Sequence, residues 1–153
     1  MDGVRWTDVV FGVAAAVSAL AVVLAVLQLR LAKAIIELEF EDGSDNEYRD
    51  LISCIPTKAL PGSGLPPCEY KATFNELYRY FDLSNQQIIP RTRKPVSPRV
   101  WTQWCAEIQY NLKSLPTFKR AWNDIKTRRT SFEELRKLEK NKFKDDPAEW
   151  GRG

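Results

Sequence analysis

Few side chains in this 153-residue sequence have the types and spacing that catalysis requires. There is no histidine, which removes the commonest general base and metal ligand and with it most triad and metallohydrolase schemes. Cys54, Cys68 and Cys105 do not make a usual zinc site without histidine. Glu133 and Glu134 fall in an expected first helical turn, where capping and the helix dipole explain them. We therefore expect a protein that is not an enzyme and that uses no cofactor and no metal ion.

The remaining candidates are basic side chains, which gather around a proline-bounded turn and along the last expected helix. Residues 70–144 carry 17 basic and 7 acidic side chains, whereas residues 1–69 carry 5 and 10. Beside a bilayer, such a surface suits anionic headgroups, at about 1 kcal/mol per basic residue. Nucleic acid is the alternative, and a solvated face is the ordinary case. The expected surface for membrane or partner comprises Arg91, Arg93, Lys94, Arg99, Arg128, Arg129, Arg136 and Lys137, with Lys140, Lys142 and Lys144 following on the last helix.

These basic residues follow an apolar stretch that organises the chain. Residues 9–29 contain no charge, and their only polar side chains are Ser18 and Gln28. As a helix rising 1.5 Å per residue, the stretch covers about 30 Å, which matches the hydrocarbon core of a bilayer. A helix also satisfies its own backbone polar groups, as lipid requires. We expect one membrane-spanning helix at 9–29.

A cleaved signal peptide is the competing interpretation of this stretch. Residues 32–34 have the small-x-small form of a cleavage site. The apolar run is longer than the usual 7–15 residues, however, and the leader carries Asp2 and Asp8 against a single Arg5. These features favour an anchor that is not cleaved.

The basic residues that flank the span indicate its orientation. Arg5 stands before it, while Arg30 and Lys33 stand after it. Cytoplasmic flanks carry the excess of basic residues, so we expect the N-terminus outside and the body in the cytoplasm, at the inner (cytoplasmic) membrane. Trp6 lies where an interfacial aromatic side chain is typical.

Small residues make one flank of the span nearly flat. Gly12 and Ala16 stand four residues apart, as do Ala14 and Ser18. This spacing allows close backbone approach of another helix and predicts helix packing in the membrane, although an alanine-rich anchor without a partner has the same composition. A homo-oligomer is neither indicated nor excluded.

We expect an all-α protein, with one N-terminal transmembrane helix followed by a small cytoplasmic helical domain. The expected segments are an extracytoplasmic N-terminus (1–8), the span (9–29), an acidic neck with a Pro/Gly-rich loop (30–69), a basic aromatic-rich domain (70–144) and a polar tail (145–153). The neck's acids would stand off from the bilayer or pair with the basic face. Cys54 and Cys68 flank the loop and could be bridged, but in the cytoplasm we expect reduced thiols that serve as small apolar residues.

Local patterns place the elements of the body. Residues 35–41 alternate apolar and acidic, which suits a short strand or a helix end, and residues 43–46 form a turn. A short helix with its apolar face at Tyr48, Leu51, Ile52 and Ile55 follows, and residues 56–67 form a loop.

Four further helices are expected in residues 70–144. One contains residues 74–81, and the next begins at Ser97 as N-cap with Pro98 at the first helical position. Another begins near Pro116. The last begins with a capping box at 131–134. Helically spaced aromatic side chains indicate a core more than a binding groove, namely Tyr78, Tyr80, Trp101, Trp104, Phe118 and Trp122.

Residues 70–130 resemble the body of small bacterial membrane proteins with one N-terminal span and a cytoplasmic helical domain of unknown function. The shared features are an "LYRYFDL" helix, a short basic turn, a W-x-x-W helix and a P-x-F-x-x-A-W helix, here at Leu77 to Leu83, Trp101 with Trp104, and Pro116 with Phe118, Ala121 and Trp122. The glycine usual in the basic turn of that group is absent from residues 91–95. Some of those proteins carry the provisional label of phage abortive-infection proteins, so the resemblance implies a defence role.

Two function classes follow from these observations. The first is a non-catalytic membrane-anchored interaction protein: a scaffold, an accessory subunit or a defence-type sensor. Its partners would be the lipid bilayer and a protein bound through the span or the body. The second is a membrane-tethered nucleic-acid-binding protein that uses the basic turn and the last helix.

Overall fold

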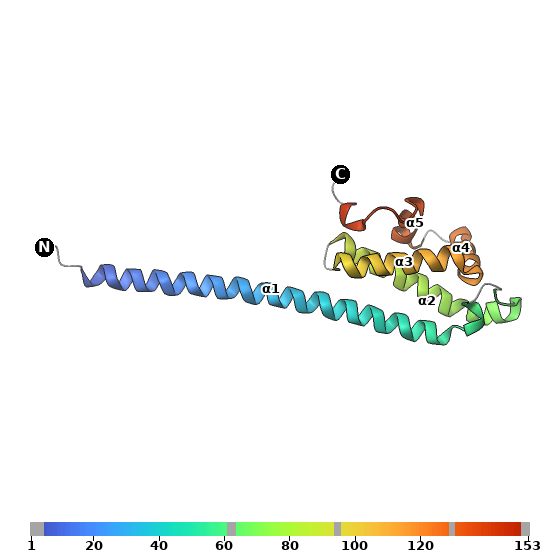
Figure 1. Cartoon of the computed structure of the whole chain (residues 1–153), viewed down its shortest axis with the longest axis horizontal. Coiled ribbons are helices and arrows are strands. Elements are labelled where there is room, and N and C mark those ends of the chain that lie inside the picture. Colours follow the sequence, from blue (N-terminus) through green and yellow to red (C-terminus); the bar gives the residue numbers. More distant parts are fainter. Residues whose placement is uncertain (1–4, 61–63, 94–95, 129–130, 151–153) are drawn as a thin grey trace. The chain divides into compact units, whose positions relative to one another are not determined.

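The computed structural model describes residues 5–60, 64–93, 96–128 and 131–150, and no strand occurs among them. The fold is all-α, as expected. The chain forms two compact units, residues 1–38 and 39–153. The helices labelled in Figure 1 are α1 (Trp6–Cys54), α2 (Pro67–Thr92), α3 (Pro98–Ser114), α4 (Pro116–Arg128) and α5 (Glu133–Lys140), and two short 3-10 helices are η1 (Thr57–Ala59) and η2 (Pro147–Glu149).

The first unit is the N-terminal part of α1. Within the described part of the chain, α1 is the one helix long and apolar enough to cross a membrane. Its large apolar side chains are exposed, from Trp6 (81%) through Leu20 (60%) to Leu38 (59%). In water such a surface would be costly, at about 25 cal/mol per Å² of apolar area.

α1 continues without interruption into the second unit. It runs through Gly43, so the expected turn at residues 43–46 is wrong, and residues 35–41 are helix rather than strand. Glycine inside a helix costs about 1 kcal/mol, and tertiary contacts on both sides offset this cost. Phe40 packs edge-on against Trp104, with ring centroids 6.3 Å apart. One turn beyond the glycine, Tyr48 packs on Tyr80.

α2 is much longer than the helix expected at residues 74–81. Residues 82–85, which follow the expected segment, are also helical, and Leu83 and Ser84 are buried. The Ser84 hydroxyl donates to the Tyr80 carbonyl at 2.9 Å, so this buried polar group is satisfied inside the helix. Before α2, the expected loop contains the single turn η1.

The core of the second unit is rich in aromatic rings. Tyr80 contacts Phe118 and Phe81 edge-on, with centroids 5.0 and 5.2 Å apart. Asn111 donates a hydrogen bond to the Tyr80 hydroxyl oxygen at 2.9 Å. Burial raises the pKa of Tyr80, so the phenol stays protonated. The core prediction is confirmed: Tyr80, Trp101, Trp104, Phe118 and Trp122 are buried, and half-buried Tyr78 packs against them.

The starts of α3 and α5 follow different rules. At α3 the prediction is confirmed, since the Ser97 hydroxyl accepts from the Val100 amide at 3.3 Å. At α5 the capping box is wrong. The N-cap is Phe132, held at a φ of 66° without a side-chain cap, while Asn85 of α2 accepts from the Leu135 amide at 3.1 Å. The Phe132 ring is buried in the core, and this burial fixes Phe132 at the N-cap position of α5. The same packing brings Asn85 to the N-terminus of α5.

The end of α5 is a Schellman turn without glycine. The Phe143 amide donates to the Leu138 carbonyl at 3.0 Å, and the Lys142 amide donates to Glu139 at 2.9 Å. Lys142 and Phe143 both have positive φ, at 58° and 60°. Beyond this turn the expected polar tail differs from the structure, because Pro147 is fully buried and η2 packs on α2.

The buried Trp122 provides a test of the core. Trp122→Ala should lower the free energy of unfolding by about 3–5 kcal/mol, because it leaves a large cavity beside Phe81. Urea unfolding of the full chain in neutral detergent, followed by near-UV circular dichroism, measures this loss. The exposed Tyr110→Ala serves as control and should change the free energy by less than about 0.5 kcal/mol. An unchanged midpoint for Trp122→Ala would contradict the core assignment.

The turn at Lys142 provides a second test. Lys142→Gly should raise the free energy of unfolding by about 1 kcal/mol, because glycine adopts positive φ without steric strain. Lys140→Gly, two residues earlier in the last turn of α5, should lower it by about 1 kcal/mol. The same unfolding measurement checks both. If Lys142→Gly were no more stable than the natural chain, the strain would be absent.

Candidate functional site

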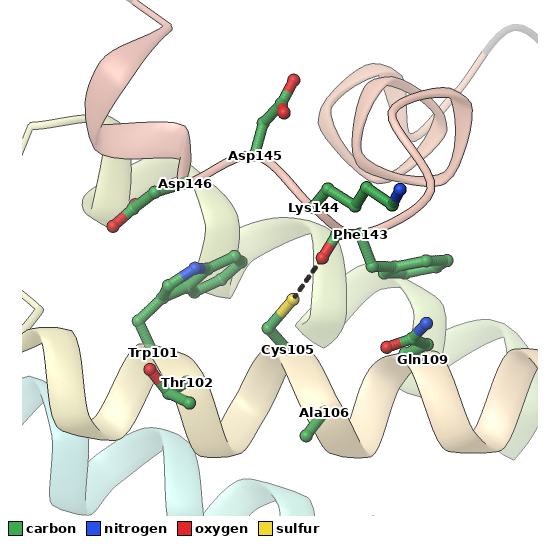
Figure 2. A pocket seen from close by; sticks show the side chains of 9 residues that line it. All are labelled: Trp101, Thr102, Cys105, Ala106, Gln109, Phe143, Lys144, Asp145 and Asp146. Atoms are coloured by element: carbon green, nitrogen blue, oxygen red, sulfur yellow. Dashed lines mark hydrogen bonds between the residues drawn. The ribbon is translucent and has the colours of Figure 1, made fainter.

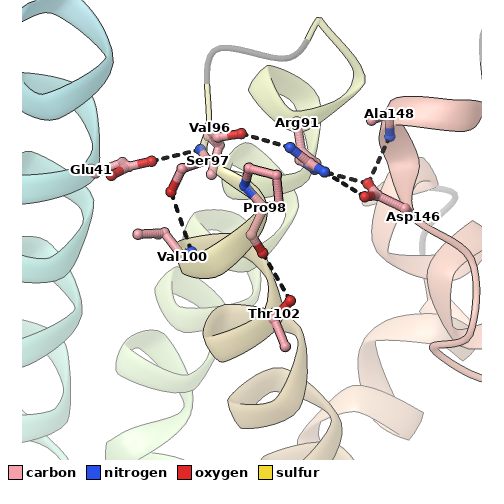
Figure 3. A network of polar contacts seen from close by, with 9 residues as sticks. All are labelled: Glu41, Arg91, Val96, Ser97, Pro98, Val100, Thr102, Asp146 and Ala148. Carbon is pink, nitrogen blue, oxygen red and sulfur yellow. Dashed lines mark hydrogen bonds and ion pairs between the residues drawn. The ribbon is translucent and has the colours of Figure 1, made fainter. Parts of the chain in front are cut away.

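The first expected basic residue, Arg91, lies inside the protein. Its side chain is only 7% exposed. Its Nε donates to Asp146 Oδ1 at 2.8 Å, a second nitrogen pairs with Asp146 Oδ2, and Nη1 donates to the Val96 carbonyl at 2.7 Å (Figure 3). Asp146 Oδ1 also accepts from the Ala148 amide at 2.9 Å, which caps η2. Arg91 is therefore not a surface residue, and its assignment to the membrane or partner surface is wrong.

This position has a physical cause. A buried guanidinium needs a counter-charge and acceptors for its N–H groups, and Asp146 with Val96 supplies them. The network joins the end of α2 to the segment before α3 and to η2 (Figure 3). Its contribution is structural.

Two acids of the expected neck are also used inside the second unit. Glu41 Oε1 accepts from the Ser97 amide at 2.7 Å, and Asp45 Oδ1 accepts from the Trp104 indole at 2.8 Å. The expectation was that the neck's acids stand off or pair with basic side chains. These two instead bind a backbone amide and an indole N–H, and they fix α1 onto α3.

The other expected surface residues have separate environments. Arg93 and Arg99 are exposed. Arg136 is half-buried and donates to two carbonyls, those of Ser131 at 2.8 Å and Lys126 at 3.4 Å, so it joins the end of α4 to the start of α5. Lys94 and Arg129 lie outside the described residues, as does the side chain of Arg128.

The structure brings together a group of lysines that we call the lysine edge. Its members are exposed and lie on α5, on the turn after it and at the end of α3: Lys113, Lys137, Lys140, Lys142 and Lys144. Lys113 Nζ is 5.3 Å from the centroid of Phe143, and Lys137 Nζ is 4.2 Å from that of Trp150. Sequence reasoning missed Lys113, because only the packing of Phe143 on α3 makes it a neighbour of the others.

A pocket of about 370 Å³ lies between α3 and the segment after α5 (Figure 2). The Cys105 thiol faces it and donates weakly to the Phe143 carbonyl at 3.9 Å. Burial, and then the charge of Asp146, raises the pKa of the Cys105 thiol, so the thiolate is scarce at neutral pH. The Cys105 thiol is therefore a weak nucleophile at neutral pH.

The other cysteines differ from the expectation that they serve as small apolar residues. Cys54 and Cys68 are exposed, and all three thiols are free. Across the described residues, no three Cys, Asp or Glu side chains are grouped to hold a metal ion.

The residues expected to pack in the membrane, Gly12, Ala14, Ala16 and Ser18, are exposed on α1. The Ser18 hydroxyl donates to the Ala14 carbonyl at 2.9 Å, which satisfies its proton within the helix. Their packing against another helix stays a prediction. Comparisons with protein-family models, curated proteins and solved structures find no match.

Arg91 and Arg93 form a matched pair for testing the buried network. Arg91→Gln should lower the free energy of unfolding by about 1–2 kcal/mol. This is below the loss for a fully buried pair, because the Asp146 side chain is 37% exposed and can be hydrated. Arg93→Gln removes the same charge from an exposed position and should change it by less than about 0.5 kcal/mol. Urea unfolding measures both, and equal effects would refute the structural role of Arg91.

Proposed function

We propose that this chain is a non-catalytic, single-span membrane-anchored interaction protein. Its N-terminus lies outside, and its helical body lies in the cytoplasm at the inner membrane of a bacterium. The body acts as a scaffold, accessory subunit or sensor. The observation that carries the proposal is the exposed apolar surface of residues 9–29 on a helix that continues into a separately packed body.

The division of apolar side chains supports an anchor. Residues of the second unit bury most of their large apolar side chains in one aromatic-rich cluster. Side chains of the first unit, such as Leu24 and Leu27, are at least half exposed. The body buries such residues, yet a segment as long as a bilayer is thick stays uncovered. This difference is expected if water surrounds the body and lipid surrounds the segment.

The charges flanking the segment support the orientation. Arg30 and Lys33 follow it and only Arg5 precedes it, and basic flanks remain in the cytoplasm. The resemblance of residues 70–130 to bacterial single-span proteins agrees with this arrangement and motivates the defence-type role.

The chemistry of the body supports a non-catalytic role. The chain has no histidine. Burial raises the pKa of both Tyr48 and Tyr80, and burial with the charge of Asp146 raises that of Cys105. A raised pKa keeps a phenol or thiol protonated, which is unsuited to a general base or a nucleophile at neutral pH.

Thiol labelling tests the anchor and its orientation. Cys54 and Cys68 are exposed and should react readily, whereas half-buried Cys105 should react slowly. In spheroplasts, an impermeant maleimide should leave all three unlabelled until the membrane is permeabilised. Asp2→Cys, in a background without the native cysteines, is the control and should be labelled before permeabilisation.

Two outcomes would contradict the proposal. Labelling of Cys54 in intact spheroplasts would reverse the orientation. A mature N-terminus at Ile35, found by N-terminal sequencing, would show a cleaved signal peptide instead of an anchor.

A further inference from the structure

The two expected basic clusters have different surroundings in the structure. Around the turn before α3, Arg91 is buried and paired. Ser97 of the same turn is bound by Glu41 of α1, and the exposed acids Glu39 and Asp42 flank Glu41 on that helix. Positive and negative charges are therefore mixed at this turn, and their fields largely cancel beyond a Debye length of about 10 Å.

The lysine edge keeps an excess of positive charge, although the exposed acids Asp145 and Glu149 lie next to Lys144 and Trp150 in the sequence. None of its five lysines forms an ion pair with a described residue. Glu139, an acid on the same helix, forms an ion pair with Lys126 of α4, with Lys126 Nζ 2.7 Å from Glu139 Oε1. The edge therefore presents an excess of exposed positive charge, which is the arrangement that attracts an anionic surface.

The backbone at the edge is a second observation. Lys142 has a φ of 58° at the helix-terminating position where glycine is usual, and Phe143 follows at 60°. Lysine is strained there, and its side chain is exposed. A strained residue retained at the surface motivates a role for its charge.

The side chains at the edge fit lipid headgroups. Lys113 and Lys137 lie over the half-buried rings of Phe143 and Trp150. Aromatic rings are common at the polar boundary of a bilayer, where phosphate and glycerol groups lie. Lysine ammonium groups above such rings can contact the phosphates. Lysines act as point charges and lack the bidentate geometry by which arginine reads bases, so they suit a charged surface more than a specific nucleic-acid site.

We propose that the lysine edge docks the body on anionic phospholipid headgroups of the leaflet from which α1 emerges. This inference rests on the proposed function, in which the span tethers the body to that leaflet. Tethering makes docking intramolecular, so weak contributions suffice. Each lysine near an anionic surface should shift the ratio of docked to undocked body about fivefold.

A fluorescence experiment on the full chain tests the proposal. The native cysteines are replaced (Cys54→Ser, Cys68→Ser, Cys105→Ala), and a fluorophore is attached at Ser114→Cys, an exposed position beside Lys113. The protein is placed in nanodiscs of phosphatidylcholine with or without phosphatidylglycerol, each containing nitroxide-headgroup lipid as quencher. We expect strong quenching in the anionic discs that is lost at 1 M salt, and little in neutral discs.

Matched variants separate the edge from general charge. Lys140→Gln with Lys144→Gln should lower the docked-to-undocked ratio about 25-fold. Lys71→Gln with Lys119→Gln removes two charges that are also exposed but lie elsewhere, and should change the ratio less than about twofold. Lys142→Gly should lower it about fivefold although the same change relieves backbone strain, so loss of folding cannot explain the effect.

Several results would overturn the proposal. They are equal quenching in neutral and anionic discs, equal effects of the two double variants, or edge variants that lose binding to a short RNA or DNA duplex while lipid quenching is unchanged. The last result would assign the edge to nucleic acid. Failure of the anchor is seen separately, because a chain without a span would not co-purify with the discs or would leave them at alkaline pH.

Discussion

A buried positive charge sets several features of the second unit. The Arg91 guanidinium is removed from water, and such a group is tolerated only with a counter-charge and with acceptors for its N–H groups. Asp146 and the Val96 carbonyl meet that demand. The same carboxylate caps η2, so the C-terminal segment is packed on α2. Position 96, held by the guanidinium, leads directly into the Ser97 cap of α3.

The junction at Ser97 couples this network to α1. Glu41 accepts the Ser97 amide, and one turn later Asp45 accepts the Trp104 indole. These bonds, with the packing of Phe40 on Trp104, occupy the face of α1 on both sides of Gly43. The helix therefore continues where its composition favours a turn. In this way the part of α1 that belongs to the second unit packs against the core of the body.

Burial, and not position in the sequence, distinguishes two groups of basic side chains on the body. Arg91 and Arg136 donate hydrogen bonds to carbonyl or carboxylate groups of the protein, whereas the side chains of the lysine edge are exposed to solvent. Arginine suits the inner positions because its planar fork binds several acceptors at once. Some basic side chains therefore stabilise the fold, and others are exposed on the surface. The proposed docking depends on the exposed group.

Features that depend on neighbours along the chain were predictable from the sequence. They include the all-α fold, the apolar segment, the Ser97 cap and the burial of Trp122, because helical period and capping act within a few residues. Contacts between distant residues decided the rest. Asn85 caps α5 from 50 residues away, Asp146 neutralises Arg91 across 55, and Phe143 brings Lys113 to the lysine edge. A local sequence pattern does not tell which distant residue will contact a given side chain. Burying a polar group without a hydrogen-bond partner costs free energy, and this cost determines the pairing only when the whole core assembles.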